Sequence, residues 1–171
     1  MFSCKKWSVY FLFLMNAVAL TGCGIYSFRD VSIDYTKVKT IKIGFIDNKA
    51  RYINPQLSPR LTDKLQQKIV AQTKLTRTNN DDAHYDISGY ISDYSVTTAA
   101  ISSTQASTNR LTVAVHLVLK KSLENKTEEF DVSRNFDFSA TKSLQEAESQ
   151  LLDEILRNLT DEIFNKIFSN W

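Results

Sequence analysis

Few side chains in this 171-residue chain are of a type that carries out chemistry by itself. The chain has two cysteines, Cys4 and Cys23, and two histidines, His84 and His116. A cysteine thiolate is a nucleophile, whereas a histidine exchanges protons near neutral pH or binds a metal. Cys23 has the most informative neighbours of the four.

Cys23 follows Leu20-Thr21-Gly22, and this stretch resembles the lipobox of bacterial lipoproteins. Small residues let the chain enter a peptidase in extended form, and the cysteine sulfur takes a diacylglycerol group as a thioether. Cleavage between Gly22 and Cys23 then frees an amine that can also be acylated, for example with palmitate. Each buried CH₂ contributes about 0.8 kcal/mol, so several acyl chains form a lasting membrane anchor. We therefore predict that Cys23 carries S-diacylglycerol and N-acyl groups.

The residues before Cys23 have the order of a signal peptide. Lys5 and Lys6 precede an apolar run from Val9 to Leu20, which is shorter than the roughly 20 residues that cross a bilayer. We predict that residues 1–22 are a lipoprotein signal peptide that is removed together with Cys4, so Cys23 has no disulfide partner within the chain. Two alternatives are an uncut membrane anchor and an ordinary secretory signal beside an accidental cysteine.

Removal of residues 1–22 also changes the charge balance. The 21 basic residues fall to 19, equal to the 19 acidic residues, so the basic character of the whole chain does not indicate nucleic-acid binding. Gly24 follows the cysteine, where an aspartate holds lipoproteins of enteric bacteria in the inner membrane. The resemblance to that sorting scheme favours the outer membrane, in its periplasm-facing leaflet.

The remaining residues do not form a recognisable active site. The sequence has no HExxH motif, no CxxC pair and no glycine-rich phosphate loop. His84 and His116 are interpreted as surface or satisfied residues, and Glu128 and Glu129 cannot easily cooperate, because neighbouring residues of a strand point to opposite faces. We expect no enzymatic activity, no metal and no cofactor, with a lipid-anchored cell-wall or glycan enzyme as an alternative class.

Periodicity predicts the elements that position these residues. Residues 23–39 are interpreted as the lipidated N-terminus and a tether, and residues 40–171 as one domain. Residues 40–46 alternate as a strand with Ile41, Ile43 and Phe45 on one face. Ser58-Pro59 is typical of a helix start, and that helix is expected to end near Gln72.

Three further strands and a second helix follow. The strands are expected within residues 85–98, 111–119 and 130–138, with a loop over residues 99–109 and a turn over residues 122–126. A bulge is proposed at Gly89, and a bulge or a strand end at Arg134. Ser143 and Glu146 form a capping-box pattern before a long amphipathic helix. The predicted fold class is α+β, with two helices packed on one face of a mainly antiparallel four-stranded sheet, in the order strand-helix-strand-strand-strand-helix.

The whole mature chain resembles the LptE-like lipopolysaccharide-assembly lipoprotein family. The matching stretches are GCGIYSF, TIKIGFIDNKARYINPQLSPRLTDKL, DISGYISDY, NRLTVAVHLVL and LLDEILRNLTDEIFNKIFSNW. The resemblance implies an α+β sandwich that plugs an LptD-like outer-membrane β-barrel and supports delivery of lipopolysaccharide to the cell surface. It implies binding rather than catalysis, and the uncharged residues 99–109 would suit insertion into the barrel.

The resemblance also implies that basic residues near the sheet contact lipopolysaccharide. Arg110, Lys120 and Lys121 are the candidates, while scattered surface charge balanced by acids is the alternative interpretation of these residues. The alternative function for the chain is an accessory lipoprotein subunit of an envelope ABC transporter or secretion system.

Overall fold

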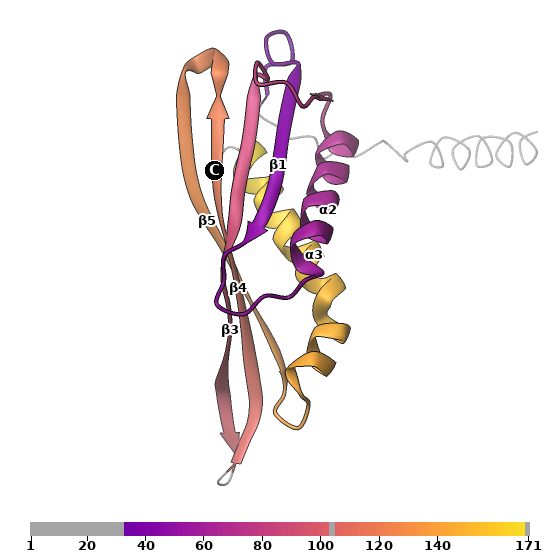
Figure 1. Ribbon diagram of the computed structural model, residues 1–171, viewed down its shortest axis with the longest axis vertical. Coiled ribbons are helices and arrows are strands. Elements are labelled where there is room, and N and C mark those ends of the chain that lie inside the picture. The colour runs from indigo at the N-terminus through magenta and orange to yellow at the C-terminus, as the bar shows by residue number, and fades with distance from the viewer. Residues whose placement is uncertain (1–32, 103–104, 170–171) are drawn as a thin grey trace, which may run out of the picture.

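A computed structural model of the chain describes residues 33–102 and 105–169 (Figure 1). Gly22 and Cys23 lie outside the described residues, as does most of the predicted tether. The elements, in chain order, are β1 (Thr40–Asn48), α2 (Leu57–Gln72), β2 (Thr76–Arg77), β3 (Tyr85–Ser102), β4 (Gln105–Lys121), the 3₁₀ helix η2 (Ser122–Glu124), β5 (Lys126–Ser139) and α3 (Leu144–Phe168).

The sheet has five strands in the order β2-β1-β3-β4-β5. The predicted four-stranded, mainly antiparallel sheet is therefore only partly correct. β1 pairs in parallel with both β2 and β3, whereas β3, β4 and β5 form an antiparallel meander. The parallel pairing arises because α2 carries the chain back to the starting end of β1, which is how helical crossovers join parallel strands. β2 has two residues, too few for any periodicity in the sequence.

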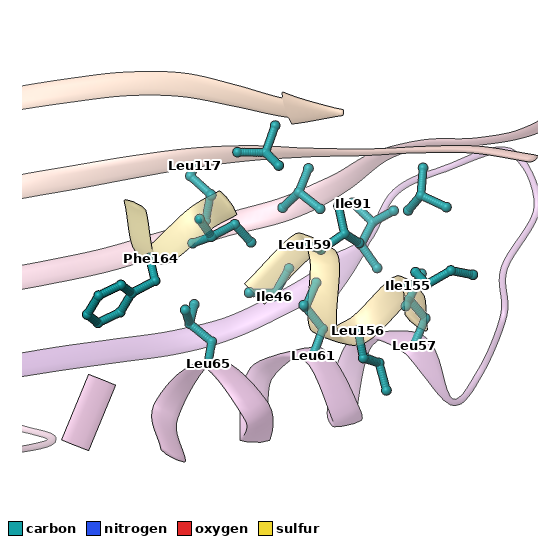
Figure 2. Packing of buried hydrophobic residues seen from close by; sticks show 14 of the residues in the cluster. Ile46, Leu57, Leu61, Leu65, Ile91, Leu117, Ile155, Leu156, Leu159 and Phe164 are labelled. Atoms are coloured by element: carbon teal, nitrogen blue, oxygen red, sulfur yellow. The ribbon is translucent and has the colours of Figure 1, made fainter. Parts of the chain in front are cut away.

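Both helices cover the same face of the sheet, as predicted (Figure 1). The core lies between the two helices and the sheet. It includes Leu61 and Leu65 of α2 and Leu159 of α3, which pack toward Ile91 and Leu117 of the sheet (Figure 2). All five of these side chains are inaccessible to solvent. The four-residue apolar repeat of α2 and the stripe of α3 thus form one continuous core.

β1 departs from the predicted alternation after Ile43. Its pairing register with β3 shifts between Ile43 and Ile46, so that Ile46 points into the core in place of Phe45. A one-residue shift moves the following side chains to the opposite face of a strand. The prediction that Phe45 shares the core face is therefore wrong, and its ring is 55% exposed.

The predicted loop over residues 99–109 is instead the end of a long hairpin. β3 and β4 remain paired up to Ser102 and Gln105, and the hairpin extends beyond the β5–α3 turn (Figure 1). The ladder between β4 and β5 has no register shift, so the bulge proposed at Arg134 is absent there. The guanidinium of Arg134 pairs with Glu162 of α3 instead, which explains a charged residue at a core-facing position.

The two helix starts differ in how well the sequence predicted them. The Ser143 hydroxyl accepts a hydrogen bond from the Glu146 backbone N–H, and the Glu146 carboxylate accepts one from the Ser143 N–H, which confirms the capping box. α2 begins at Leu57, so Ser58 lies within its first turn and is not the N-cap. The predicted end of α2 near Gln72 is confirmed.

Candidate functional site

The sheet face opposite the helices is a polar surface. In the part of the chain that the structure describes, no helix lies on this face (Figure 1). Cross-strand pairs line it: the Thr112 hydroxyl donates to the Asn135 side-chain oxygen over 2.9 Å, and the Tyr90 and His116 rings lie 5.2 Å apart. The Lys49 ammonium lies 4.3 Å from the centroid of the Tyr90 ring. This surface combines cations, aromatic rings and hydroxyls, a composition suited to binding rather than to folding alone.

Arg110, the first predicted contact residue, lies on this face and pairs with Asp137 of β5. Its Nε and Nη2 donate to the two carboxylate oxygens of Asp137 over 2.7 and 2.9 Å. This bidentate pairing holds the pKa of Asp137 below its usual value and raises that of Arg110. The guanidinium is 44% exposed, so it remains accessible on one side while its charge is locally neutralised.

Lys120 and Lys121 lie on opposite faces at the end of β4, since they are consecutive residues of a strand. The Lys121 ammonium donates to the Glu128 carboxylate over 3.0 Å and is only 19% exposed. Lys120 is exposed and has no ion pair within residues 33–102 and 105–169. The structure therefore does not bring the three predicted cations together into one cluster. Lys120 is the one without a direct ion pair, although it lies opposite Asp86 of β3 and its charge contributes to lowering the pKa of Asp81.

Both histidines have structural partners, in agreement with their interpretation as satisfied residues. The His84 Nδ1 accepts a hydrogen bond from the Lys39 backbone N–H over 2.8 Å, which joins the start of β1 to that of β3. The His116 Nδ1 lies 2.9 Å from a carboxylate oxygen of Asp131. Over the described ranges, no group of three His, Cys, Asp or Glu side chains is arranged to hold a metal ion.

A second polar site involves α3 and was missed from the sequence. The two carboxylate oxygens of Glu148 accept hydrogen bonds from the Tyr94 hydroxyl over 2.7 Å and from the Tyr52 hydroxyl over 3.3 Å. Burial, together with the bond to Glu148, raises the pKa of Tyr94. The three residues are far apart in the chain, so no local pattern connects them.

Among the described residues, no helix is both long enough and apolar enough to cross a membrane.

Comparison with known proteins gives one family match. The model of the family described as LptE, lipopolysaccharide-assembly, matches residues 38–167. A search of curated proteins found no match.

Several solved structures are similar to the chain. The hypothetical protein CT253 from Chlamydia trachomatis matches with a TM-score of 0.54 at 11% identity, over 76% of this chain and 95% of that chain. PelC from Paraburkholderia phytofirmans, solved as a dodecamer, gives 0.49 at 10% identity over 78% and 90%. Rare lipoprotein B from Shewanella oneidensis gives 0.46 at 10% identity over 74% and 89%. At such low identity, the likeness to CT253 concerns the fold alone.

Proposed function

Because the chain belongs to the lipopolysaccharide-assembly family LptE, we propose that it is an outer-membrane lipoprotein that binds an LptD-like β-barrel and lipopolysaccharide. The observation that carries this proposal is the extent of the family match, which runs from Val38 to Ile167 and so includes every strand and nearly all of α3. The chain would support delivery of lipopolysaccharide to the cell surface.

The side chains of the domain support binding rather than catalysis. Arg110 and His116 of the open sheet face have carboxylate partners on β5, an arrangement that stabilises the sheet. A general acid or base needs a substrate-sized site around it and a pKa matched to its task, whereas these two side chains are engaged by neighbouring carboxylates on the sheet. We infer that the open face and the β3–β4 hairpin are contact surfaces for the barrel and the lipid.

The anchor would complete this arrangement. Cys23 would be lipidated after cleavage behind Gly22, and Gly24 would direct the protein to the outer membrane. Residues 23–39 would then be the lipidated N-terminus and the tether between the lipid and the domain.

The contact with lipopolysaccharide is assigned to basic side chains of β4. Lys120 is the first choice, because its ammonium has no ion-pair partner in the described part of the chain, whereas Lys121 and Arg110 each have a carboxylate partner. A phosphate group would have to compete with those carboxylates. We expect Lys120→Ala to weaken lipopolysaccharide binding more than Lys121→Ala does, as measured by retention of radiolabelled lipopolysaccharide on the purified protein.

The deciding experiment is purification of the tagged full-length protein from detergent-solubilised membranes. We expect a large outer-membrane β-barrel to copurify, and an untagged strain serves as the control. Recovery of inner-membrane transporter subunits without a barrel would contradict the proposal and favour an accessory subunit of an envelope transporter or secretion system.

A further inference from the structure

A cavity lies between the β1–α2 loop and the first turns of α3. Its volume is about 490 Å³, and Tyr52, Asn54 and Gln56 of the loop face Gln145 and Glu148 of the helix across it. Pro55, Ser149 and Leu152 complete the lining. The lining contains one carboxylate and no lysine, arginine or histidine.

Glu148 is an anion held in place by neutral groups. Tyr94 and Tyr52 each donate one hydroxyl to its carboxylate, and among the described residues no cation lies within ion-pair distance of it. A carboxylate has about four acceptor sites, so roughly two remain for a ligand. Two phenol hydroxyls fix the orientation of the carboxylate without neutralising its charge. The negative charge at the cavity is thus both positioned and uncompensated.

The aromatic side of the cavity favours a planar cation. The rings of Tyr52 and Tyr94 are stacked with centroids 5.4 Å apart, and Tyr52 also lines the cavity. A guanidinium stacks on aromatic rings and has five N–H donors, which the side-chain oxygens of Gln56 and Gln145 could accept together with Glu148. The Asn54 oxygen is already engaged, because it accepts a hydrogen bond from the Gln56 backbone N–H over 2.9 Å. An anionic phosphate would be repelled by the same carboxylate.

The loop that lines one side of the cavity also exposes apolar surface. Tyr52 is 43% exposed, and Ile53, the next residue along the loop, is 61% exposed. An exposed apolar side chain next to the cavity would give a polypeptide ligand an additional packing contact. A free small cation would gain nothing from that contact.

We propose that this cavity is a docking site for an arginine side chain of a partner polypeptide, with Glu148 binding the guanidinium and Tyr52 and Ile53 packing beside it. The inference rests on the proposed function only for the identity of the partner, which would be the β-barrel. The site is distinct from the basic residues of β4, and its ligand has the opposite charge to lipopolysaccharide phosphates.

The test uses the full-length protein in detergent and N-acetyl-arginine amide as the probe, followed by saturation-transfer NMR. We expect Glu148→Gln to weaken binding about tenfold, the loss of one charge-assisted contact. Glu154→Gln, the same charge change on the same helix outside the cavity, should leave binding unchanged. N-acetyl-citrulline amide, which has the same shape without the charge, and methyl glucoside should not bind.

A second variant guards against misfolding of Glu148→Gln. Ser149→Lys changes an exposed helix residue that contacts neither tyrosine, and its ammonium should occupy the site and abolish probe binding. Any of three results would overturn the inference. The arginine and citrulline probes could bind equally, the arginine signal could be unchanged in both cavity variants, or the glucoside alone could bind.

The inference and the proposed function can fail separately. A barrel that copurifies with the protein while the arginine probe does not bind would refute the docking site alone. Probe binding that Glu148→Gln weakens about tenfold, without any copurifying barrel, would refute the proposed function and leave the docking site standing.

Discussion

Gly89 lies where β3 passes closest to β4. A Cβ atom at this position would be 2.4 Å from the His116 carbonyl oxygen and 3.2 Å from the Leu117 Cα, both of them backbone atoms. Gly89→Ala must therefore separate the strands, and we expect a loss of about 1–3 kcal/mol in the free energy of unfolding, measured in urea.

Gly44→Ala is the matched control for this change. A Cβ there would lie 3.3 Å from the Ile87 carbonyl oxygen, a contact that a small backbone adjustment relieves. The cost of Gly44→Ala should be clearly smaller. Equal stability of the two variants would show that close strand approach at Gly89 is not the constraint. The bulge proposed at Gly89 is only partly correct. The β1–β3 register shifts next to Gly89, but the extra residue is in β1, and the β3–β4 register first shifts between Ile91 and Asp93.

Glu128 gives the domain a pH-dependent contribution to stability. Hydrogen bonds from Lys126 and Lys121 lower its pKa below the usual 4.5. A carboxylate whose pKa is lower in the folded state stabilises the fold above its ordinary pKa and loses that contribution as the pH falls through the folded value. We expect Glu128→Gln to cost up to about 1 kcal/mol at neutral pH, because the site is partly exposed.

Thermal unfolding at a series of pH values measures this effect. The difference in melting temperature between the unmodified protein and Glu128→Gln should shrink below the usual carboxylate pKa of 4.5 and vanish in stronger acid. Glu124→Gln in the adjacent turn serves as the control for loss of a charge. A difference that grew with acidification would have the wrong sign for this explanation.

At the scale of elements, the buried hydroxyl of Thr62 links α2 to β1 by a hydrogen bond. The Thr62 Oγ1 of α2 accepts a hydrogen bond from the Ile46 N–H over 3.1 Å, just after the register shift of β1, and donates to the Ser58 carbonyl over 2.8 Å. Thr62→Val keeps the side-chain shape but leaves the Ile46 N–H without an acceptor. We expect a destabilisation of about 1–3 kcal/mol.

Thr62→Ser separates the hydrogen bond from packing. Serine keeps the hydroxyl and loses only a methyl group, so this variant should be the more stable of the two in urea unfolding. If Thr62→Val matched the unmodified protein, the Ile46 N–H would have another acceptor, and the hydroxyl would not be what fixes the register shift.

The elements that the sequence predicted best are those whose signal is local. The capping box at Ser143 and the alternation from Leu111 to Leu119 depend on neighbouring residues, and both are confirmed. The displacement of Phe45 from the core depends on pairing with a strand about forty residues away, and no pattern within β1 records it. The Tyr94–Glu148 contact was missed for the same reason, because it exists only after α3 packs on the sheet.

At the scale of the molecule, α2 and α3 bury one face of the sheet, and among the described residues no helix covers the other face (Figure 1). Under the proposed function, the polar face, the projecting β3–β4 hairpin and the cavity beside Glu148 are the surfaces that partners would contact. Antiparallel strands such as β3, β4 and β5 tolerate one solvated face, so the domain can fold before a partner binds. The apolar core is therefore separate from these surfaces, although ion pairs on the polar face also stabilise the sheet.

A lipid anchor at Cys23 would decide where these surfaces are presented. We predict that Cys23→Ser, which removes the sulfur that would form the thioether, abolishes lipidation and moves the protein from the membrane to the soluble fraction. Membrane fractionation and labelling with radioactive palmitate measure both effects, and Cys4→Ser, within the predicted signal peptide, is the control that should change neither. Because the domain from Val38 onward has its own core, the Cys23→Ser protein should still unfold cooperatively in urea. Retained label together with unchanged fractionation would contradict Cys23 as the lipidated residue. Unlabelled protein that stays in the membrane before and after the substitution would instead favour an uncut membrane anchor, and unlabelled soluble protein in both cases an ordinary secretory signal.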